Sequence, residues 1–447
     1  MKGSAPSLPD EIRLSGEFAL RGSIRTPGDK SISHRVILLG ALATGTTVAR
    51  GLSDGEDVRR TIGAASALGA EVVVEAGEVR ISGGRRRLHR CDDLDCGNSG
   101  TTMRLLAGVL AGLPWATTLF GDDSLSARPM DRVAAPLTAM GARLEGRGPK
   151  MLPPLVVEGG PLQGIDWTAS VASAQVKSAI LLAGLQAEGP TVVREPVSTR
   201  AHTEELLELG GAEITVTPWE RGRVVRLLPS ELRPLNIDVP GDPSQAAFWV
   251  VAGCILPDSE VVVEKVYGGV DRTGFMRVLE RMGAYVEQRQ GNVQGVSDIL
   301  ARYGPLVGTS IDAADIPSLD EVPALAVAAT VAEGTSVFHD VGELRVKETD
   351  RLAAVAGLVN AFGGHAEAKG DDLVIQGVGP SGHLLPGTFD SKGDHRLAMA
   401  AAVAALSCGS GGASVIRGFS GVATSYPRFL ADLDALAGRH VTEASGS

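Results

Sequence analysis

A helical stretch that ends in glycine and leads into a β-like run recurs along the whole chain of 447 residues. Successive copies lie roughly 70 to 80 residues apart, too far for an ordinary solenoid repeat. This spacing fits a βαβ-type unit with additional strands, in which each glycine ends its helix in a left-handed conformation. The copies are Leu68-Gly69-Ala70, Met140-Gly141-Ala142, Leu209-Gly210-Gly211, Met282-Gly283-Ala284, Phe362-Gly363-Gly364 and, more weakly, Leu436-Ala437-Gly438. They predict an α/β protein of six similar units.

The six units are expected to form two domains of three, since a chain of this length has ample material for more than one core. Proline and glycine interrupt a strand-like run at residues 239–243. We therefore expect the break between the two groups of three units in this segment. Residues 12–26 are expected to form a strand pair. Leu-Gly-Ala is a common helix ending, so chance is the competing explanation, and the even spacing argues against it.

Residues 27–35, with the sequence PGDKSISHR, place a turn signal before an apolar helical pattern. Lys30 and Ser31 should therefore lie where a helix begins. Backbone N–H groups and the positive end of the helix dipole favour an anion at such a point. Arg35 follows Ser31 by one turn and can face the same ligand. The segment suits a phosphate or carboxylate site, and it also fits a capped surface helix with scattered charges.

Two further segments combine glycine or arginine with a turn. Residues 97–104, GNSGTTMR, precede an apolar helix, and Gly100 would let a ligand approach the backbone closely. Arg128 lies beside Pro129, and its planar guanidinium suits a carboxylate because it binds two oxygens at once. A plain helix cap and a solvated surface arginine are the structural alternatives.

Two later segments add polar groups to the first half of the chain. Ser173, Ala174 and Gln175 open a helix that is expected to run to Leu185, where hydroxyl, backbone and amide groups could hold a phosphate and a ring hydroxyl. Arg200 follows in the segment 199–204. His202, in the same segment, is expected to cap or pack rather than to catalyse.

The second half of the chain supplies carboxylates and more cations. Asp320 precedes an Ala/Val/Leu-rich helix, where the helix dipole alone would also favour an acid. Lys347 and Arg351 are four residues apart and are expected on one helix face, a close cationic pair that favours an anion between them. Glu348 lies between the two, and Arg396 opens an alanine-rich helix at 397–406.

Composition excludes several classes of partner. A net charge of −11 argues against nucleic acid and anionic membranes, although a local cluster of arginine and lysine can still bind small anions. The four cysteines show no zinc spacing and are too sparse for a disulfide scaffold, so a reducing cytoplasm fits. No secretory signal is visible, and the longest apolar runs are too short to span a bilayer.

Taken in order, these motifs resemble the 5-enolpyruvylshikimate-3-phosphate (EPSP) synthase family of enolpyruvyl transferases, and the resemblance runs through most of the chain. It implies an inside-out α/β fold of two similar domains, each of three βαβαββ repeats, with a ligand cleft between them. In this family the chain crosses between the domains twice, which implies a discontinuous domain 1 of residues 10–27 and 243–442, a domain 2 of residues 28–242, and flexible termini at 1–9 and 443–447. It also implies transfer of the enolpyruvyl group of phosphoenolpyruvate to the 5-hydroxyl of shikimate 3-phosphate, in the pathway to chorismate and the aromatic amino acids. No metal or organic cofactor is expected.

The resemblance also implies roles for individual residues. Asp320 would accept the hydroxyl proton, while Glu348 and Lys30 are both candidates for protonating the methylene carbon. Shikimate 3-phosphate would contact Lys30, Ser31, Arg35, Ser173, Ala174, Gln175, Arg200, Asp320 and Lys347. Ala174 can offer only its backbone, because many family members carry a second serine there. Phosphoenolpyruvate would contact Lys30, Gly100, Arg128, Gln175, Arg351 and Arg396.

Two departures from the family pattern and two other functions remain open. Thr424 stands where many members have a lysine that contacts phosphoenolpyruvate. Part of the similar branch tolerates glyphosate through an alanine at the Gly100 position. The glycine here weakens that inference, so glyphosate is an expected inhibitor and tolerance is left open. A monomer is expected by resemblance alone. The alternatives are a UDP-N-acetylglucosamine enolpyruvyl transferase, although Asp123 stands where its members usually carry cysteine, and a non-catalytic anion-binding repeat protein.

Overall fold

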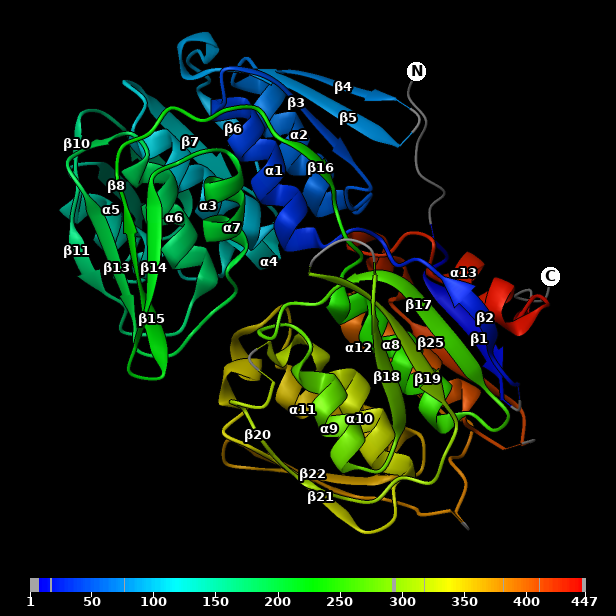
Figure 1. Ribbon diagram of the computed structural model, residues 1–447. Coiled ribbons are helices and arrows are strands. Elements are labelled where there is room, and N and C mark those ends of the chain that lie inside the picture. The colour runs from blue at the N-terminus through cyan, green and yellow to red at the C-terminus, as the bar shows by residue number, and fades with distance from the viewer. Residues whose placement is uncertain are drawn as a thin grey trace. The chain divides into compact units, whose positions relative to one another are not determined.

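The computed structural model describes residues 8–16, 18–75, 77–291, 295–316, 318–380, 382–409 and 411–443. They form two compact units (Figure 1). Unit 2 is Gly28–Val239, and unit 1 combines the described residues up to Pro27 with those from Pro240 onward. The second crossing of the chain thus precedes residue 240, earlier than the expected boundary after residue 242. The reason is local, because Gly241 N–H donates to Lys265 O at 2.7 Å and Asp242 N–H to Pro27 O at 2.9 Å, both within unit 1.

One sheet pattern recurs throughout the described residues: four strands, with a parallel pair at one edge of the sheet and antiparallel pairing between the other neighbours. Three such sheets lie in each unit, with the strand orders β16-β3-β5-β4, β6-β7-β9-β8 and β11-β13-β15-β14 in unit 2 and β18-β19-β17-β2, β20-β21-β23-β22 and β24-β25-β1-β26 in unit 1. The recurrence accounts for the even spacing of the sequence repeat.

The strands of unit 2 are short. They are β3 (Gly45–Arg50), β4 (Glu71–Glu75), β5 (Glu78–Gly83), β6 (Asp93–Asp95), β7 (Ala116–Phe120), β8 (Arg143–Arg147), β9 (Leu152–Glu158), β11 (Asp166–Thr168), β13 (Thr191–Glu195), β14 (Ile214–Trp219), β15 (Gly222–Leu227) and β16 (Asn236–Asp238). A further two-stranded sheet joins β10 (Leu162–Gln163) to β12 (Ala187–Glu188).

The strands of unit 1 include the first and the last of the chain. They are β1 (Glu11–Ser15), β2 (Arg21–Ile24), β17 (Glu260–Tyr267), β18 (Tyr285–Gln290), β19 (Val296–Arg302), β20 (Ser310–Asp312), β21 (Thr335–His339), β22 (His365–Lys369), β23 (Asp372–Gln376), β24 (Thr388–Asp390), β25 (Ala413–Arg417) and β26 (Thr442–Glu443). β1 and β2 do not pair with each other as expected for residues 12–26, because β1 lies between β25 and β26 while β2 pairs with β17. Glu443, expected in a flexible terminus, lies in β26, and residues 1–7 and 444–447 of the expected termini lie outside the described residues.

Three helices in each unit are buried along nearly their whole length and contact one another. In unit 2 they are α1 (Lys30–Leu42), α3 (Gly100–Ala111) and α6 (Ala174–Gly184), and in unit 1 they are α8 (Pro243–Ile255), α10 (Val322–Val331) and α12 (His395–Leu406). A helix that is apolar on all faces must be surrounded by protein, so the helices form the core and the half-exposed sheets lie outside them. The predicted inside-out α/β arrangement is confirmed.

The remaining helices are half-buried. They are α2 (Glu56–Ala67), α4 (Asp123–Ser126), α5 (Asp131–Ala139), α7 (His202–Leu209), α9 (Gly274–Arg281), α11 (Arg351–Ala361) and α13 (Phe429–Ala437), with 3-10 turns η1 (Arg85–Arg87), η2 (Leu319–Glu321), η3 (Gly342–Val346) and η4 (Phe419–Thr424). No helix in the described part of the chain is both long enough and apolar enough to cross a bilayer.

In each copy of the sequence repeat, one glycine has a positive φ angle. The values are 106° at Gly69, 113° at Gly141, 79° at Gly211, 90° at Gly283, 78° at Gly363 and 66° at Gly438. L-residues with a Cβ rarely adopt this region, which explains why glycine recurs at the same place in every unit. The prediction that these glycines end their helices is confirmed.

Candidate active site

The first helix of unit 2 presents Lys30 at its N-terminus. Asp29 caps α1, since its carboxylate accepts the Ile32 N–H at 2.9 Å. Lys30 is the first residue of the helix, and its Nζ forms an ion pair with Asp57 Oδ2, at the start of α2. The prediction that a helix begins at Lys30 and Ser31 is confirmed. Sequence reasoning missed Asp57, because the residues around it form no recognisable binding or catalytic motif.

A second contact joins α1 to the segment before α7. Arg200 Nη1 donates to Ser31 Oγ at 2.8 Å. Ser173 caps α6, although its hydroxyl accepts the Val176 N–H at a long 3.4 Å. Ala174, the first residue of α6, accepts a hydrogen bond from Ser178 Oγ at 2.6 Å through its carbonyl oxygen. Ser31 and Arg200 are thus in direct contact, while Ser173 and Ala174 lie at the start of a separate buried helix.

Arg35 lies in the interior of unit 2, with only 2% of its surface exposed. Its Nε donates to Thr203 Oγ1 at 2.6 Å, its Nη1 to Ser31 O at 2.8 Å and its Nη2 to Ser178 Oγ at 2.6 Å. The guanidinium therefore ties together α1, α6 and α7. Ser31 lies in α1, Ser173 caps α6, and Arg200 lies just before α7. This structural role was not visible in the sequence.

Buried charges behind Arg200 hold its segment in place. Lys177 Nζ donates to Glu195 Oε2 at 2.8 Å and to Glu204 Oε1 at 2.7 Å, and all three side chains are almost fully buried. Thr199, the residue before Arg200, donates its hydroxyl to Glu195 Oε1. Because a buried charge is tolerated only when it is paired, this cluster fixes the backbone at Arg200.

The start of α3 lies beside two arginines. Ser99 caps the helix, and Gly100 is its first residue. A Cβ atom placed on Gly100 would lie 3.1 Å from Arg104 Nη1 and 3.5 Å from Arg128 Nη1. Arg104 Nη1 donates to Gln175 Oε1 at 2.6 Å. Gly100, Arg128 and Gln175 are thus brought together around Arg104, a residue that sequence reasoning passed over although it follows Gly100 by one helical turn.

Arg128 is oriented by neighbouring polar groups. Its Nη2 donates to Asn98 Oδ1 at 2.7 Å and to Ser124 Oγ at 3.1 Å, and its Nη1 donates to Asn98 O at 3.3 Å. These acceptors are neutral, so they orient the guanidinium without cancelling its charge.

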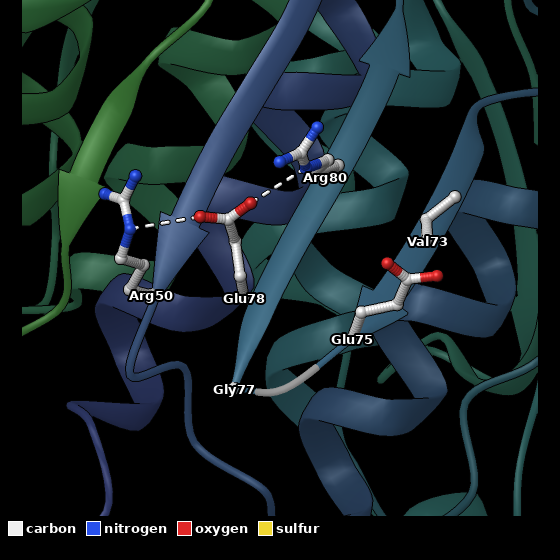
Figure 2. Close-up of a pocket in the computed structure, with 6 residues that line it drawn as sticks. All are labelled: Arg50, Val73, Glu75, Gly77, Glu78 and Arg80. Atoms are coloured by element: carbon white, nitrogen blue, oxygen red, sulfur yellow. Dashed lines mark hydrogen bonds and ion pairs between the residues drawn. The ribbon is translucent and has the colours of Figure 1, made fainter.

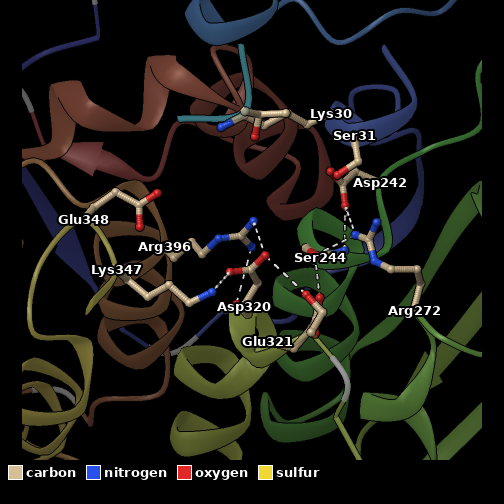
Figure 3. A network of polar contacts seen from close by, with 12 residues as sticks. Lys30, Ser31, Asp242, Ser244, Arg272, Asp320, Glu321, Lys347, Glu348 and Arg396 are labelled. Atoms are coloured by element: carbon tan, nitrogen blue, oxygen red, sulfur yellow. Dashed lines mark hydrogen bonds and ion pairs between the residues drawn. The ribbon is translucent and has the colours of Figure 1, made fainter. Parts of the chain in front are cut away.

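In unit 1, three cations surround the carboxylate of Asp320, and Figure 3 shows Lys347 and Arg396 beside it. Its Oδ1 lies 3.3 Å from Arg351 Nη1 and 3.9 Å from Lys347 Nζ, and its Oδ2 lies 3.4 Å from Arg396 Nη2. Asp320 belongs to turn η2, directly before α10, and Arg396 belongs to the first turn of α12. The expected helix starts therefore converge on one acid within this unit.

Arg351 is the most buried of these cations, with 1% exposure. Its Nε and Nη2 donate to Asp394 at 2.7 and 3.1 Å, and its Nη2 lies 2.6 Å from Glu348 Oε2. Burial alone would lower the pKa of Arg351, but the carboxylates of Glu348 and Asp394 raise it above its ordinary value. Burial likewise acts to raise the pKa of Asp394, and Arg351 holds it below the usual range. Arg351 is therefore a permanent cation at this site.

One local prediction was wrong. Lys347 and Arg351 do not share a helix face, because Lys347 follows turn η3 with φ −83° and ψ −157°, and α11 begins only at Arg351. The cause is Asp350, which caps α11 by accepting the Ala353 N–H at 3.1 Å and so starts a new helix. The anion expected between the two cations is present all the same, as the carboxylate of Asp320.

Two other residues singled out from the sequence lie in ordinary structural positions. Thr424 ends turn η4, and its hydroxyl donates to Gly421 O at 2.6 Å. His202 is fully buried at the start of α7, in line with the expectation that it caps or packs. Among the described residues, no group of His, Cys, Asp and Glu is arranged to hold a metal ion.

A shallow pocket on the sheet of β3, β4 and β5 lies in unit 2 (Figure 2). Glu78 lies 3.1 Å from Arg50 Nε and 2.8 Å from Arg80 Nε, so one carboxylate already partners both cations. None of the residues that line this pocket belongs to the groups above.

The chain was compared with known proteins. The family model of EPSP synthase (3-phosphoshikimate 1-carboxyvinyltransferase) matches residues 14–433. A 3-phosphoshikimate 1-carboxyvinyltransferase of Lactococcus lactis subsp. cremoris is 44% identical over 424 residues, which cover 93% of this chain and 97% of the relative. One of Synechococcus sp. is 46% identical over 440 residues, covering 96% of this chain and 97% of the relative.

Solved structures give the same result. EPSP synthase of Acinetobacter baumannii superposes with a TM-score of 0.85 at 39% identity, covering 98% of this chain and 99% of that chain. The enolpyruvyl transferase NikO of Streptomyces tendae, at 19% identity and a TM-score of 0.78, covers 98% of this chain and 100% of that chain and shows the shared fold alone. The site combines helix starts suited to anions with an acid among cations. These features agree with the family match over most of the sequence and with the relatives that align along nearly its whole length. The chain belongs to the EPSP synthase family, the 3-phosphoshikimate 1-carboxyvinyltransferases.

Proposed function

We propose that this chain transfers the carboxyvinyl group of phosphoenolpyruvate to the 5-hydroxyl of shikimate 3-phosphate and releases phosphate. Family membership supports the reaction. The observation within the structure that carries the proposal is the carboxylate of Asp320, which lies among Lys347, Arg351 and Arg396. A proton acceptor surrounded by cations suits a reaction between two anionic substrates.

The reaction needs two proton transfers in its first step. The 5-hydroxyl oxygen forms a bond to C2 of phosphoenolpyruvate, the hydroxyl proton leaves to a base, and the methylene carbon takes up a proton to become a methyl group. In the second step the bond between C2 and the phosphate oxygen breaks, and the methyl group loses a proton, which restores the double bond. Phosphate and the carboxyvinyl ether are the products, and no electrons are gained or lost.

We assign Asp320 as the base that accepts the proton of the 5-hydroxyl group. Protonation of the methylene carbon is assigned to Glu348 or to Lys30. Glu348 is oriented by its ion pair with Arg351, and Lys30 by its ion pair with Asp57, so both are held side chains able to exchange a proton. The cations around Asp320 would stabilise the charge of the tetrahedral intermediate.

The remaining site residues are proposed to bind the two anions. For shikimate 3-phosphate they are Lys30, Ser31, Arg35, Ser173, the backbone of Ala174, Gln175, Arg200, Asp320 and Lys347. For phosphoenolpyruvate they are Lys30, Gly100, Arg128, Gln175, Arg351 and Arg396. Opposite charges about 4 Å apart attract by about 4 kcal/mol at an effective dielectric of 20, before desolvation. A few such contacts are enough to bind acidic metabolites to a protein of net charge −11.

Three finer properties belong to the same proposal. The protein is proposed to act as a cytoplasmic monomer, and its four unpaired cysteines support a reducing compartment. Glyphosate is proposed as an inhibitor, and the glycine at position 100 is consistent with sensitivity.

A coupled assay of phosphate release tests the proposed function. Phosphoenolpyruvate is supplied with shikimate 3-phosphate, with UDP-N-acetylglucosamine, or with no acceptor. Phosphate is expected only with shikimate 3-phosphate. Release with the UDP-sugar would assign the chain to the sister reaction, and no release with either acceptor would favour a non-catalytic anion-binding protein.

A further inference from the structure

Glu321 is a buried carboxylate that follows Asp320 directly in turn η2, and no role has been given to it above. Only 1% of its surface is exposed. Its Oε1 accepts a hydrogen bond from Ser244 Oγ, in the first turn of α8 (Figure 3). A buried acid beside the proposed proton acceptor needs an explanation, because burial of a carboxylate is unfavourable unless it is compensated.

The chain of polar groups continues from Ser244 to two further residues of unit 1, Arg272 and Asp242. Arg272 Nη2 donates to Ser244 Oγ at 2.8 Å and to Asp242 Oδ1 at 2.8 Å. Asp242 caps α8 by accepting the Ser244 N–H at 2.9 Å, and its own N–H donates to Pro27 O at 2.9 Å. The turn that carries Asp320 is thus tied through Glu321 to the start of a core helix and to the segment where the chain re-enters unit 1.

Charges of both signs act on Glu321, and its burial outweighs the cations among them. Burial raises the pKa of Glu321 to about 7, Arg272 acts to lower it, the neighbouring charge of Asp320 raises it, and Ser244 and Arg396 lower it. The charged groups that face it are Arg272 from the loop before α9, Asp320 from its own turn and Arg396 from α12, with Asp242 behind Arg272. Its charge therefore changes within the pH range in which enzymes of this kind work.

We propose that Glu321 is a positioning residue for Asp320, which fixes the turn carrying Asp320 against Ser244 and whose negative charge makes Asp320 a stronger proton acceptor. The inference rests on the role proposed for Asp320. Two like charges on adjacent residues each make protonation of the other more favourable. An ionised Glu321 therefore raises the affinity of Asp320 for the hydroxyl proton, and a neutral one does not.

The test is the pH dependence of kcat between pH 5.5 and 9 for the wild type, Glu321→Gln, Glu321→Asp and Ser244→Ala. Glu321→Gln is expected to match the wild type within about twofold at pH 6 and to fall about tenfold below it at pH 8.5, since one unit of proton affinity corresponds to a factor of ten. Ser244→Ala removes a hydrogen bond that favours the ionised acid, so the midpoint should move to higher pH. Glu321→Asp keeps the carboxylate and should keep the pH dependence.

Glu333→Gln is the matched control, because Glu333 is an exposed glutamate just beyond the far end of α10. Its profile should superimpose on that of the wild type. A Glu321→Gln profile parallel to the wild type at every pH overturns the inference. If Glu321→Gln fails to fold, the inference is overturned instead by a Ser244→Ala variant whose kcat changes with pH around the same midpoint as in the wild type.

Asp320→Asn separates the inference from the function on which it rests. An inactive Asp320→Asn together with an unaltered Glu321→Gln profile refutes only the inference. Near-normal turnover by Asp320→Asn would show that Asp320 is not the proton acceptor, and the inference about Glu321 would fail with it.

Discussion

The cations of the candidate site have different partners in the two units. In unit 1, Arg351 and Arg396 lie against the carboxylates of Asp320, Glu348 and Asp394. In unit 2, the hydrogen bonds of Arg128 go to the neutral oxygens of Asn98 and Ser124.

A cation beside a carboxylate has much of its charge cancelled, whereas one beside neutral oxygens keeps it. We propose a division of labour, in which unit 1 holds acids for proton transfer and unit 2 holds residues that bind the anions. Lys30, also in unit 2, is paired with Asp57. This pairing fits a residue proposed both to bind and to transfer a proton.

The largest effect is expected for Asp320→Asn. It removes the proposed proton acceptor from the centre of the unit 1 cluster while keeping its size. Because general base catalysis contributes about 10² to 10⁴ in rate, kcat should fall about 10³-fold. Steady-state kinetics checks this, with circular dichroism to confirm folding. A loss confined to KM would contradict the division of labour, since it would make Asp320 a binding group.

The next effect concerns the stability of unit 1 as a function of pH. The folded protein raises the pKa of Glu321 from 4.5 to about 7, so folding favours its protonated form. The stabilising contribution is fully present below pH 4.5 and is lost as pH rises through 7. Between pH 5 and 8 the wild type should lose about 2 to 3 kcal/mol more than Glu321→Gln.

Urea denaturation at the two pH values measures this difference, and Glu333→Gln serves as the control. Equal losses in the wild type and Glu321→Gln would show that Glu321 does not titrate as the structure indicates.

A smaller effect is expected for Arg200→Ala in unit 2. A hydrogen bond to a charged group contributes about 1.5 to 3 kcal/mol, so KM for shikimate 3-phosphate should rise on the order of 10- to 100-fold with a smaller change in kcat. Arg194→Ala is the matched control, because Arg194 lies in an exposed ion pair with Asp166 at 2.7 Å. If kcat falls while KM stays constant, Arg200 belongs to the chemical step and the comparison between the units breaks down.

The smallest effect is expected for Gly100→Ala. The added Cβ would meet the ends of two flexible side chains, Arg104 at 3.1 Å and Arg128 at 3.5 Å, so the fold should tolerate it. Displacement of the guanidinium groups should raise KM for phosphoenolpyruvate by about a few-fold, since a contact adjusted by tenths of an ångström costs on the order of 1 kcal/mol or less. An unchanged KM would mean that neither arginine binds this substrate.

Local signals accounted for much of the fold. The start of α1 follows from Asp29 and the apolar spacing after Ile32, and the helix ends follow from glycines that require positive φ. These features depend on residues within a few positions of one another. The resemblance to a family added the βαβαββ order within each unit and the double crossing between the domains, which periodicity alone did not determine.

Long-range contacts were beyond the reach of sequence reasoning. The ion pair of Lys30 with Asp57 and the buried contacts of Arg35 with Ser178 and Thr203 depend on how helices pack, not on any local pattern. The break between Lys347 and Arg351 was missed for a different reason. Spacing alone cannot distinguish a continuous helix from one that is restarted by a capping aspartate.

The position of β1 has a consequence for the order in which the chain can fold during synthesis. Unit 2 has every strand partner once β16, which ends at Asp238, has been made. By contrast, β1 pairs Leu14 with Ser414 and with Thr442, so its sheet is incomplete until residue 442 has been synthesised. Unit 2 can therefore fold early during synthesis. Until its partners have been made, β1 has unpaired edges, which chaperones could protect from aggregation.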